Sequence, residues 1–278
     1  MDTFTIGGDL EVRRLGFGAM RITGDGIWGP PDDPEGARRL LRRVVELGVN
    51  LIDTADSYGP EVSENLIAAA LHPYPDGLVL ATKGGLRRTG PGQWRRDARP
   101  ERLKECCEAS LRRLKLDRID LYQLHSPDPK VPYEDSIGAL KELRDEGKIR
   151  HIGISNVSTG QLDQARGVVD VVTVQNRYNV TDRDSEDVLE ACERDGLGFI
   201  PWYPLATGDL AEPGGPLGDV ARAHDATPGQ VAIAWLLARS PSMLPIPGTS
   251  SIDHLEENLK GADLELSAEE IETVGAAA

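Results

Sequence analysis

Short apolar segments alternate with amphipathic helical segments along nearly all of this 278-residue chain. The apolar segments have the length of strands and lie at 15–18, 50–53, 78–82, 119–125, 149–155, 171–175, 197–202 and 243–247. The helical segments between them include 34–48, 100–116, 133–147, 159–167, 184–196 and 227–240. Strands that alternate with helices form a parallel sheet, and eight such units favour a closed barrel over an open sheet. The sequence therefore predicts an α/β fold, the (β/α)8 or TIM barrel.

The first residues and the length complete this prediction. Residues 4–12 predict a short β-hairpin that turns at Gly7, Gly8 and Asp9 and covers the bottom of the barrel. Single barrels of this type commonly have about 250 residues. Composition does not shift along the chain, and no linker divides it. We therefore expect one domain over residues 1–278.

The charge and the cysteines exclude several classes of protein. A formal net charge of −15 argues against nucleic acid or an anionic membrane as a partner, because both require a positive field. The chain has no apolar stretch of membrane-spanning length and no signal-peptide pattern at its start. The three cysteines, Cys106, Cys107 and Cys192, form neither a disulfide framework nor a metal-binding spacing. We expect a cytoplasmic protein without a metal, either a monomer or a homo-oligomer.

Polar side chains follow the predicted strands where each strand ends. Asp53 ends the second strand and runs into the loop that carries Tyr58, Lys83 ends the third, and His125 ends the fourth. Catalytic groups of such barrels gather at these carboxyl ends. A tyrosine hydroxyl has an ordinary pKa near 10, and an adjacent ammonium lowers it, so that the pair becomes a useful acid at neutral pH. This set therefore favours proton donation to a carbonyl oxygen during hydride transfer, in which alkoxide charge develops.

Each of these residues taken alone has a simpler explanation. A lysine at a strand end is usually a solvated charge, and a lone histidine is more often part of a satisfied core. Tyr58 could pack in its loop, and Asp53 could cap a helix. A hydrolytic barrel would need a pair of inward carboxylates at strand ends, and only Asp53 qualifies clearly. The order of the four residues on consecutive strands favours the reductive chemistry.

Several longer motifs resemble the signatures of the aldo-keto reductase family. They are GVNLIDTADSYGP at 48–60, LATKGG at 80–85, DLYQLHSPDP at 120–129, IGISNVS at 152–158, VQNRYN at 174–179 and IPGTSSIDHLEEN at 246–258. The resemblance implies that Tyr58 is the acid, that Lys83 and Asp53 tune it, and that His125 orients the carbonyl. It also implies an NADP(H)-dependent oxidoreductase that reduces small aldehydes and ketones to alcohols. The alternative is a related barrel that binds the cofactor as a regulatory or channel-associated subunit with little turnover.

The resemblance also implies where the cofactor lies. Ser155, Asn156 and Gln175 would bind the nicotinamide carboxamide, and Trp202 would stack under the ring, although Trp202 could instead fill the core. The chain has no G-x-G-x-x-G fingerprint, and the sequence GTSS at 248–251, at the start of a helix, is a suitable phosphate cradle. The remaining expected cofactor residues are Met20, Tyr203, Pro204, Leu205, Gly248, Thr249, Ser250, His254, Glu257 and Asn258.

The chain departs from the best-known family pattern at two cofactor positions. Gly248 stands where that pattern has a basic residue, and His254 stands where it has arginine. Both usually reach the 2′-phosphate of NADP(H), and a charge-assisted hydrogen bond contributes about 1.5–3 kcal/mol. Their loss weakens the preference for NADP(H), but Thr249, Ser250 and His254 still offer donors. NADP(H) remains the expected cofactor, with NAD(H) as the alternative.

The substrate side is expected in two segments. The loop at 20–34 would place Ile27 and Trp28 near the pocket mouth, and a short C-terminal tail would leave the pocket open. An open pocket suits a broad or planar aromatic substrate. The GTSS variant and the WYPL stretch at 202–205 are similar to the bacterial branch of the family that includes pyridoxal reductases.

Overall fold

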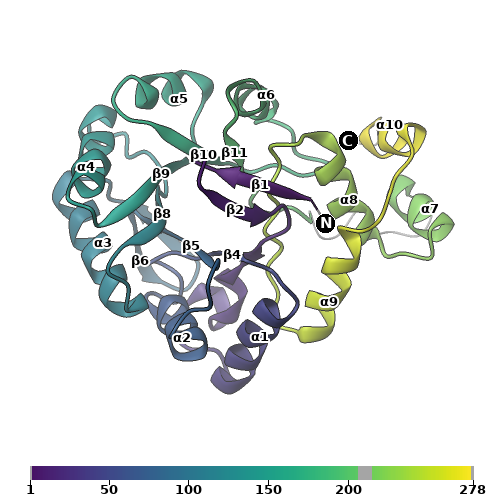
Figure 1. Ribbon diagram of the computed structural model, residues 1–278, viewed down its shortest axis with the longest axis horizontal. Coiled ribbons are helices and arrows are strands. Elements are labelled where there is room, and N and C mark those ends of the chain that lie inside the picture. The colour runs from purple at the N-terminus through teal and green to yellow at the C-terminus, as the bar shows by residue number, and fades with distance from the viewer. Residues whose placement is uncertain (1, 206–214, 277–278) are drawn as a thin grey trace.

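A computed structural model describes residues 2–205 and 215–276. Its central sheet has seven parallel strands in the order β11-β10-β9-β8-β5-β4-β3. They are β3 (Phe17–Gly18), β4 (Leu51–Asp53), β5 (Val79–Gly84), β8 (Ile119–Leu124), β9 (Ile149–Ser155), β10 (Val171–Gln175) and β11 (Gly198–Phe199). The sheet is curled, and helices surround it on the outside (Figure 1).

The eighth side of the barrel is an extended segment at 242–247. The Phe199 N–H donates to the Ser242 carbonyl at 2.8 Å, and the Leu244 N–H donates back to the Phe199 carbonyl at 2.8 Å. On the other edge the Gly16 N–H donates to the Pro245 carbonyl at 2.9 Å. These bonds join β11 to the segment that leads into β3, and so the barrel closes as predicted. The expected regular strand at 243–247 is wrong, since Pro245 and Pro247 have no N–H to give to a ladder.

The described residues form the helices α1 (Pro34–Glu46), α2 (Val62–Leu71), α3 (Pro100–Leu114), α4 (Tyr133–Asp145), α5 (Thr159–Arg166), α6 (Glu186–Asp195), α7 (Pro216–Ala223), α8 (Pro228–Arg239), α9 (Ile252–Gly261) and α10 (Ala268–Ala276). Six of them, α1, α3, α4, α5, α6 and α8, follow the expected segments closely, and α9 begins directly after the expected helix start at 248–251. Helix α1 is typical, because its apolar residues at helical spacing face the sheet, whereas its arginines face outward. Within the described residues no helix is long and apolar enough to cross a membrane.

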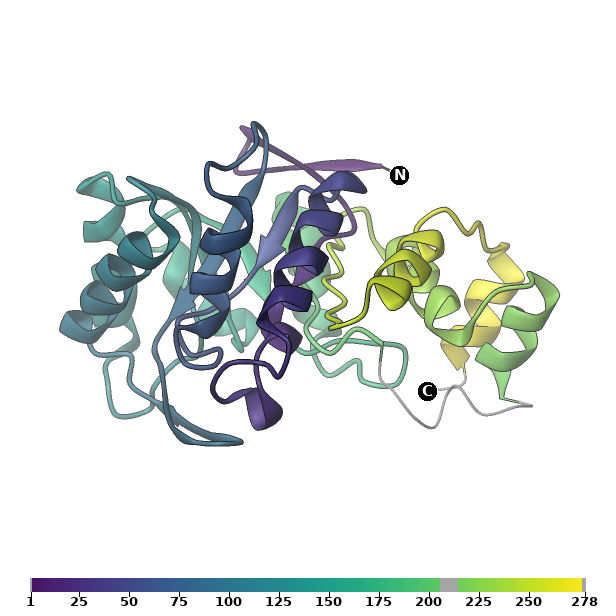
Figure 2. The same ribbon diagram turned by 90° about the horizontal axis from the view of Figure 1, so that it is seen from below.

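The N-terminal hairpin closes one end of the barrel. Strands β1 (Thr3–Ile6) and β2 (Leu10–Arg13) pair antiparallel, and Figure 2 shows them lying across the end of the barrel. Ile6 and Val12 are fully buried and pack with Leu51 and Val79, the first residues of β4 and β5. The hairpin therefore covers the amino end of the barrel, as predicted, and the opposite end stays open to solvent.

A second hairpin stands at that opposite end. Strands β6 (Leu86–Gly90) and β7 (Gln93–Arg96) pair antiparallel directly after β5, before helix α3 begins. Two short 3-10 helices, η1 (Ala19–Ile22) and η2 (Asp25–Ile27), follow β3 at the same end. Neither the second hairpin nor helices α2, α7 and α10 were predicted from the sequence.

Candidate functional site

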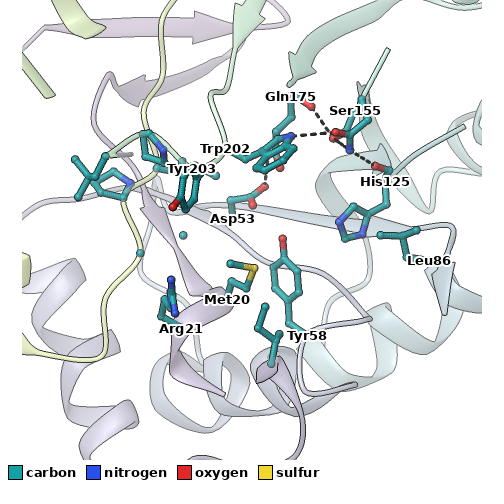
Figure 3. A pocket seen from close by; sticks show the side chains of 18 of the residues that line it. Met20, Arg21, Asp53, Tyr58, Leu86, His125, Ser155, Gln175, Trp202 and Tyr203 are labelled. Carbon is teal, nitrogen blue, oxygen red and sulfur yellow. Dashed lines mark hydrogen bonds between the residues drawn. The ribbon is translucent and has the colours of Figure 1, made fainter. Parts of the chain in front are cut away.

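The carboxyl ends of the strands surround a cavity of about 410 Å³. Most of the predicted site residues line it: Met20, Ile27, Asp53, Tyr58, His125, Ser155, Asn156, Gln175, Trp202, Tyr203, Pro204, Leu205 and Gly248. Figure 3 shows Asp53, Tyr58 and Trp202 turned towards the same space. The structure adds lining residues that the sequence analysis missed: Gly18, Arg21, Leu86, Trp94, Ile246 and Pro247.

Lys83 lies directly beneath this cavity and is fully buried. Its ammonium donates to Asp53 Oδ1 at 2.5 Å, to the Thr54 carbonyl at 2.8 Å and to the Tyr58 hydroxyl at 3.3 Å. An ammonium has three donors, and each has an acceptor here. Burial opposes the charge on Lys83, but Asp53 and Tyr58 leave the pKa of the ammonium above its usual value. The lysine is therefore charged, and its orientation is fixed.

Asp53 is held on both of its oxygens. Oδ1 accepts from Lys83, whereas Oδ2 accepts from the side-chain amides of Gln123 at 3.0 Å and Gln175 at 2.9 Å. The carboxylate is 1% exposed, and buried carboxylates are stable only when they are paired and hydrogen-bonded in this way. Gln123 was not predicted, although it stands two residues before His125 and so points to the same face of β8. Gln175 was expected to bind the nicotinamide, and in the structure its side-chain amide nitrogen donates to Asp53.

Tyr58 presents its hydroxyl to the cavity above this ion pair. Burial raises the pKa of Tyr58 above its ordinary value, while the charge of Lys83 and its hydrogen bond act to lower it. The net shift is upward, so the lysine offsets burial only in part. The Tyr58 ring packs edge-on against His125, with 5.9 Å between ring centroids.

His125 contacts the loop that carries Tyr58. Its Nδ1 lies 3.4 Å from the Ser57 hydroxyl, and its own carbonyl accepts from the Asn156 amide at 2.9 Å. Burial and the nearby Lys83 keep the pKa of His125 well below its usual value. The imidazole is therefore neutral, and in the tautomer whose Nδ1 accepts from the Ser57 hydroxyl, Nε2 carries a proton that it can donate.

The predicted nicotinamide residues lie together across the cavity. Asn156 adopts a left-handed backbone, with φ at 60°, which turns its amide towards Ser155 and Trp202. The Trp202 Nε1–H donates to Asn156 Oδ1 at 3.0 Å, and the Asn156 amide donates to Ser155 Oγ at 3.0 Å (Figure 3). A flat indole beside a cluster of amide and hydroxyl groups fits a planar ring that carries a carboxamide.

The predicted phosphate end of the cofactor site is a close approach of two backbone segments. A Cβ on Gly248 would lie 2.6 Å from the Gly18 carbonyl oxygen, and a Cβ on Gly18 would lie 2.6 Å from the Ile246 carbonyl oxygen. Neither position can therefore carry a side chain without moving the backbone. Arg21 lines the cavity at this point and has its Cγ 3.5 Å from that Cβ position of Gly248.

The expected residues farther along this segment do not line the cavity. Helix α9 begins after Ser251, whose hydroxyl accepts from the His254 N–H at 3.4 Å, so that the predicted helix start is present. Thr249 accepts from the Ser251 N–H, and Glu257 accepts from the Thr227 hydroxyl at 2.8 Å. Ser250 and His254 are exposed and Asn258 is buried. The adenine contacts proposed for Glu257 and Asn258 stay predictions.

The two expected substrate residues behave differently. Ile27 lines the cavity, whereas Trp28 does not and lies instead over the guanidinium of Arg88, with 5.8 Å to its ring centroid. The aromatic residue that reaches the cavity on this side is Trp94 on β7. A Gly-Pro-Gly turn followed closely by a tryptophan was the available signal for such a hairpin.

Known proteins resemble this chain over nearly its full length. A family model described as the aldo/keto reductase family matches residues 14–278. An uncharacterized oxidoreductase of Schizosaccharomyces pombe is 53% identical over 94% of this chain and 85% of its own length. Pyridoxine 4-dehydrogenase of Escherichia coli is 43% identical over 98% of this chain and 97% of its own length. The crystal structure of an aldo-keto reductase from Klebsiella pneumoniae in complex with NADPH superposes with a TM-score of 0.84, at 27% identity, over 99% and 94% of the two chains.

Proposed function

Because this chain belongs to the aldo/keto reductase family, it is an NADP(H)-dependent oxidoreductase of carbonyl and CH–OH groups, and we propose that its substrate is a planar aromatic aldehyde of the pyridoxal type. The observation that carries the proposal is the chain of contacts from Asp53 through Lys83 to the Tyr58 hydroxyl, at the floor of the cavity. The alternative, a regulatory subunit with little turnover, has no support among the relatives described above.

NADPH, when bound, supplies the hydride that reduces the carbonyl carbon. Tyr58 is the proposed acid, because its hydroxyl faces the cavity and would donate its proton to the carbonyl oxygen as alkoxide charge develops. Lys83 favours this transfer, since an ammonium at 3.3 Å stabilises the phenolate that Tyr58 leaves behind. Asp53 keeps the ammonium in place and balances its charge, so that both can stay buried.

His125 is the proposed second donor to the carbonyl oxygen. A neutral imidazole can donate a hydrogen bond without competing as an acid, and His125 lines the same cavity as Tyr58, with 5.9 Å between the ring centroids. Two donors that converge on the developing oxyanion lower the barrier by the mechanism of an oxyanion hole.

The cofactor side of the proposal rests on three groups of residues. Trp202 would stack on the nicotinamide ring, and Ser155 and Asn156 would bind its carboxamide. Gly248 and Gly18 let the backbone approach the phosphates, and Arg21 supplies a positive charge there. In this arrangement Arg21 takes the place of the basic residue that the family pattern has at position 248.

The substrate class is supported by the lining and by one relative. Ile27, Leu86 and Trp94 also line the cavity, and their apolar side chains favour a flat apolar ring. The relative from Escherichia coli acts, by its name, on pyridoxine. We also expect the protein to work in the cytoplasm as a monomer or homo-oligomer, since its three cysteines are free and buried.

The test is a spectrophotometric assay of NADPH and NADH oxidation with pyridoxal, other aromatic aldehydes and aliphatic aldehydes. We expect turnover of pyridoxal with NADPH and a loss of about 10²–10⁴-fold in the Tyr58→Phe variant, with NADPH binding retained. Tyr133→Phe is the matched control, because the Tyr133 hydroxyl is buried without a hydrogen-bond partner among the described residues. Turnover of simple aldehydes with none of pyridoxal would refute the substrate, and tight NADPH binding with no turnover would refute the activity.

A further inference from the structure

The hairpin of β6 and β7 places an arginine face to face with a tryptophan. Arg88 and Trp94 are opposite each other in the antiparallel register, so their side chains share one face of the hairpin. The guanidinium carbon lies 3.8 Å from the centroid of the Trp94 ring. This distance is that of direct stacking, in which the cation rests on the indole face.

The guanidinium also joins three loops through main-chain carbonyls. Five hydrogen bonds of 2.7–3.3 Å run to the carbonyl oxygens of Gly26, Ile27, Ser57, Gly90 and Gln93. A guanidinium has five N–H donors, so the number of bonds equals its full capacity. Among the described residues no carboxylate forms an ion pair with Arg88, and its partners are carbonyls of the β6–β7 turn, of η2 and of the loop before Tyr58. The arginine therefore acts as a cross-link between backbone segments.

The other side of this cross-link faces the cavity. Trp94 lines the cavity and keeps 37% of its surface exposed. Its ring stands edge-on to Tyr58 at 6.3 Å and to His125 at 6.3 Å between centroids. Three aromatic rings thus form a corner around the point where a carbonyl oxygen would meet the Tyr58 hydroxyl.

We propose that Trp94 is the residue that selects planar aromatic carbonyl substrates, and that Arg88 is a positioning residue that holds Trp94 in the wall of the cavity. An aromatic ring bound in this corner would contact the indole while its carbonyl points to Tyr58 and His125, whereas a short aliphatic chain would leave the indole uncovered. This inference rests on the proposed function, which it extends from a substrate class to the residues that choose it.

The first test compares Trp94→Leu with the wild-type holoenzyme on pyridoxal, 4-nitrobenzaldehyde and butanal. We expect KM for the two aromatic aldehydes to rise about tenfold and kcat/KM for butanal to change less than about threefold. A merely structural role for Trp94 would lower kcat/KM for all three substrates alike, and that result would overturn the inference.

The second test isolates Arg88 with a matched neighbour. Arg88→Met keeps an apolar stem under the indole but removes all five donors, so we expect the same loss of aromatic preference as in Trp94→Leu. Arg87→Gln is the control, because Arg87 directly precedes Arg88 in β6, points to the other face of the strand and pairs with Asp97 at 3.6 Å. Equal effects of the two arginine variants, or no change in preference for Arg88→Met, would overturn the positioning role.

A binding measurement separates this inference from the proposed activity. Calorimetry with the enzyme saturated with NADPH and pyridoxine as the ligand does not depend on turnover, because an alcohol cannot accept a hydride from the reduced cofactor. We expect Trp94→Leu to weaken pyridoxine binding about tenfold. If the wild type binds pyridoxine but reduces no aldehyde, the proposed activity fails while the role of Trp94 stands. Equal pyridoxine affinity in the wild type and in Trp94→Leu would overturn that role.

Discussion

The carboxyl group of Asp56 lies in the loop between Asp53 and Tyr58, and it should make the stability of this protein depend on pH. Asp56 is 6% exposed, and its Oδ1 has no hydrogen-bond partner among the described residues. Burial raises the pKa of Asp56 to about 7, and the Glu64 carboxylate adds to the shift, whereas the Cys106 thiol, Arg113 and Arg102 oppose it. The folded protein therefore binds a proton here at pH values where the unfolded chain has released it.

The sign and size of the effect follow from linkage. The pKa of Asp56 is higher in the folded protein than in the unfolded chain. The free energy of unfolding therefore falls as pH rises from about 4 to about 7. One pKa unit corresponds to about 1.4 kcal/mol, so the shift from 3.8 to about 7 costs the wild type about 4 kcal/mol above pH 7. At pH 5 only about 2 kcal/mol of this cost is present by the same relation. Asp56→Asn, which cannot ionise, should therefore gain about 2–3 kcal/mol relative to the wild type on going from pH 5 to pH 8.

Urea unfolding of both proteins at pH 5 and pH 8, followed by circular dichroism, measures this difference directly. Asp76→Asn is a suitable control, since Asp76 is an exposed aspartate in the loop after α2. If the difference in unfolding free energy between Asp56→Asn and the wild type were the same at both pH values, the carboxyl would not be buried as described, and the reasoning would fail.

Three further predictions follow from the site. Lys83→Met should lower the free energy of unfolding by about 3–5 kcal/mol in a urea titration, because its carboxylate partner would stay buried without a counter-charge. The pH profile of kcat/KM for reduction should be level through neutral pH and fall only in the alkaline range, because the acid form of Tyr58 is required and burial raises its pKa; an alkaline limb near pH 7 would contradict this. Arg21→Gln should weaken NADPH binding about 10–100-fold in a fluorescence titration, whereas Gly248→Lys should destabilise the fold without tightening NADPH, because its Cβ would meet a carbonyl oxygen at 2.6 Å.

The proximity of the proposed catalytic residues could be predicted because their position follows from the fold class. In a parallel barrel the carboxyl ends of all strands meet at one rim, so polar residues that end successive strands must lie close together. To predict that Asp53, Lys83 and His125 lie together, the strand boundaries had to be only approximately right. Tyr58 could be added because it follows Asp53 in a short loop. The hydrogen bonds of Asp53 to Gln123 and Gln175 follow from the same rule, but they became visible only with the register of the sheet.

The missed elements have weak local signals, and for the β6–β7 hairpin the signal is limited to its Gly-Pro-Gly turn. Helix α2 begins after Glu61, which has a left-handed backbone with φ at 68° and no side-chain cap, so no N-terminal cap precedes it in the sequence. The eighth side of the barrel has two prolines, and its hydrogen bonds come from neighbours distant in sequence. The β6–β7 hairpin is rich in arginine and lacks the alternation of a buried strand, because it packs on loops through Arg88 rather than on the core.

The arrangement of the buried charges would let Tyr58 serve as the proposed acid in a site that disfavours ionisation. Burial alone would make the hydroxyl a poorer acid, and the Asp53 carboxylate has the same effect. The ammonium of Lys83 bonds to both Asp53 and Tyr58, so the hydroxyl contacts the positive end of a neutral pair. The two glutamine amides on Asp53 hold the negative end in place on the far side. The pair therefore adds no net charge to the barrel, yet it stabilises a phenolate at the one position where the reaction would form it.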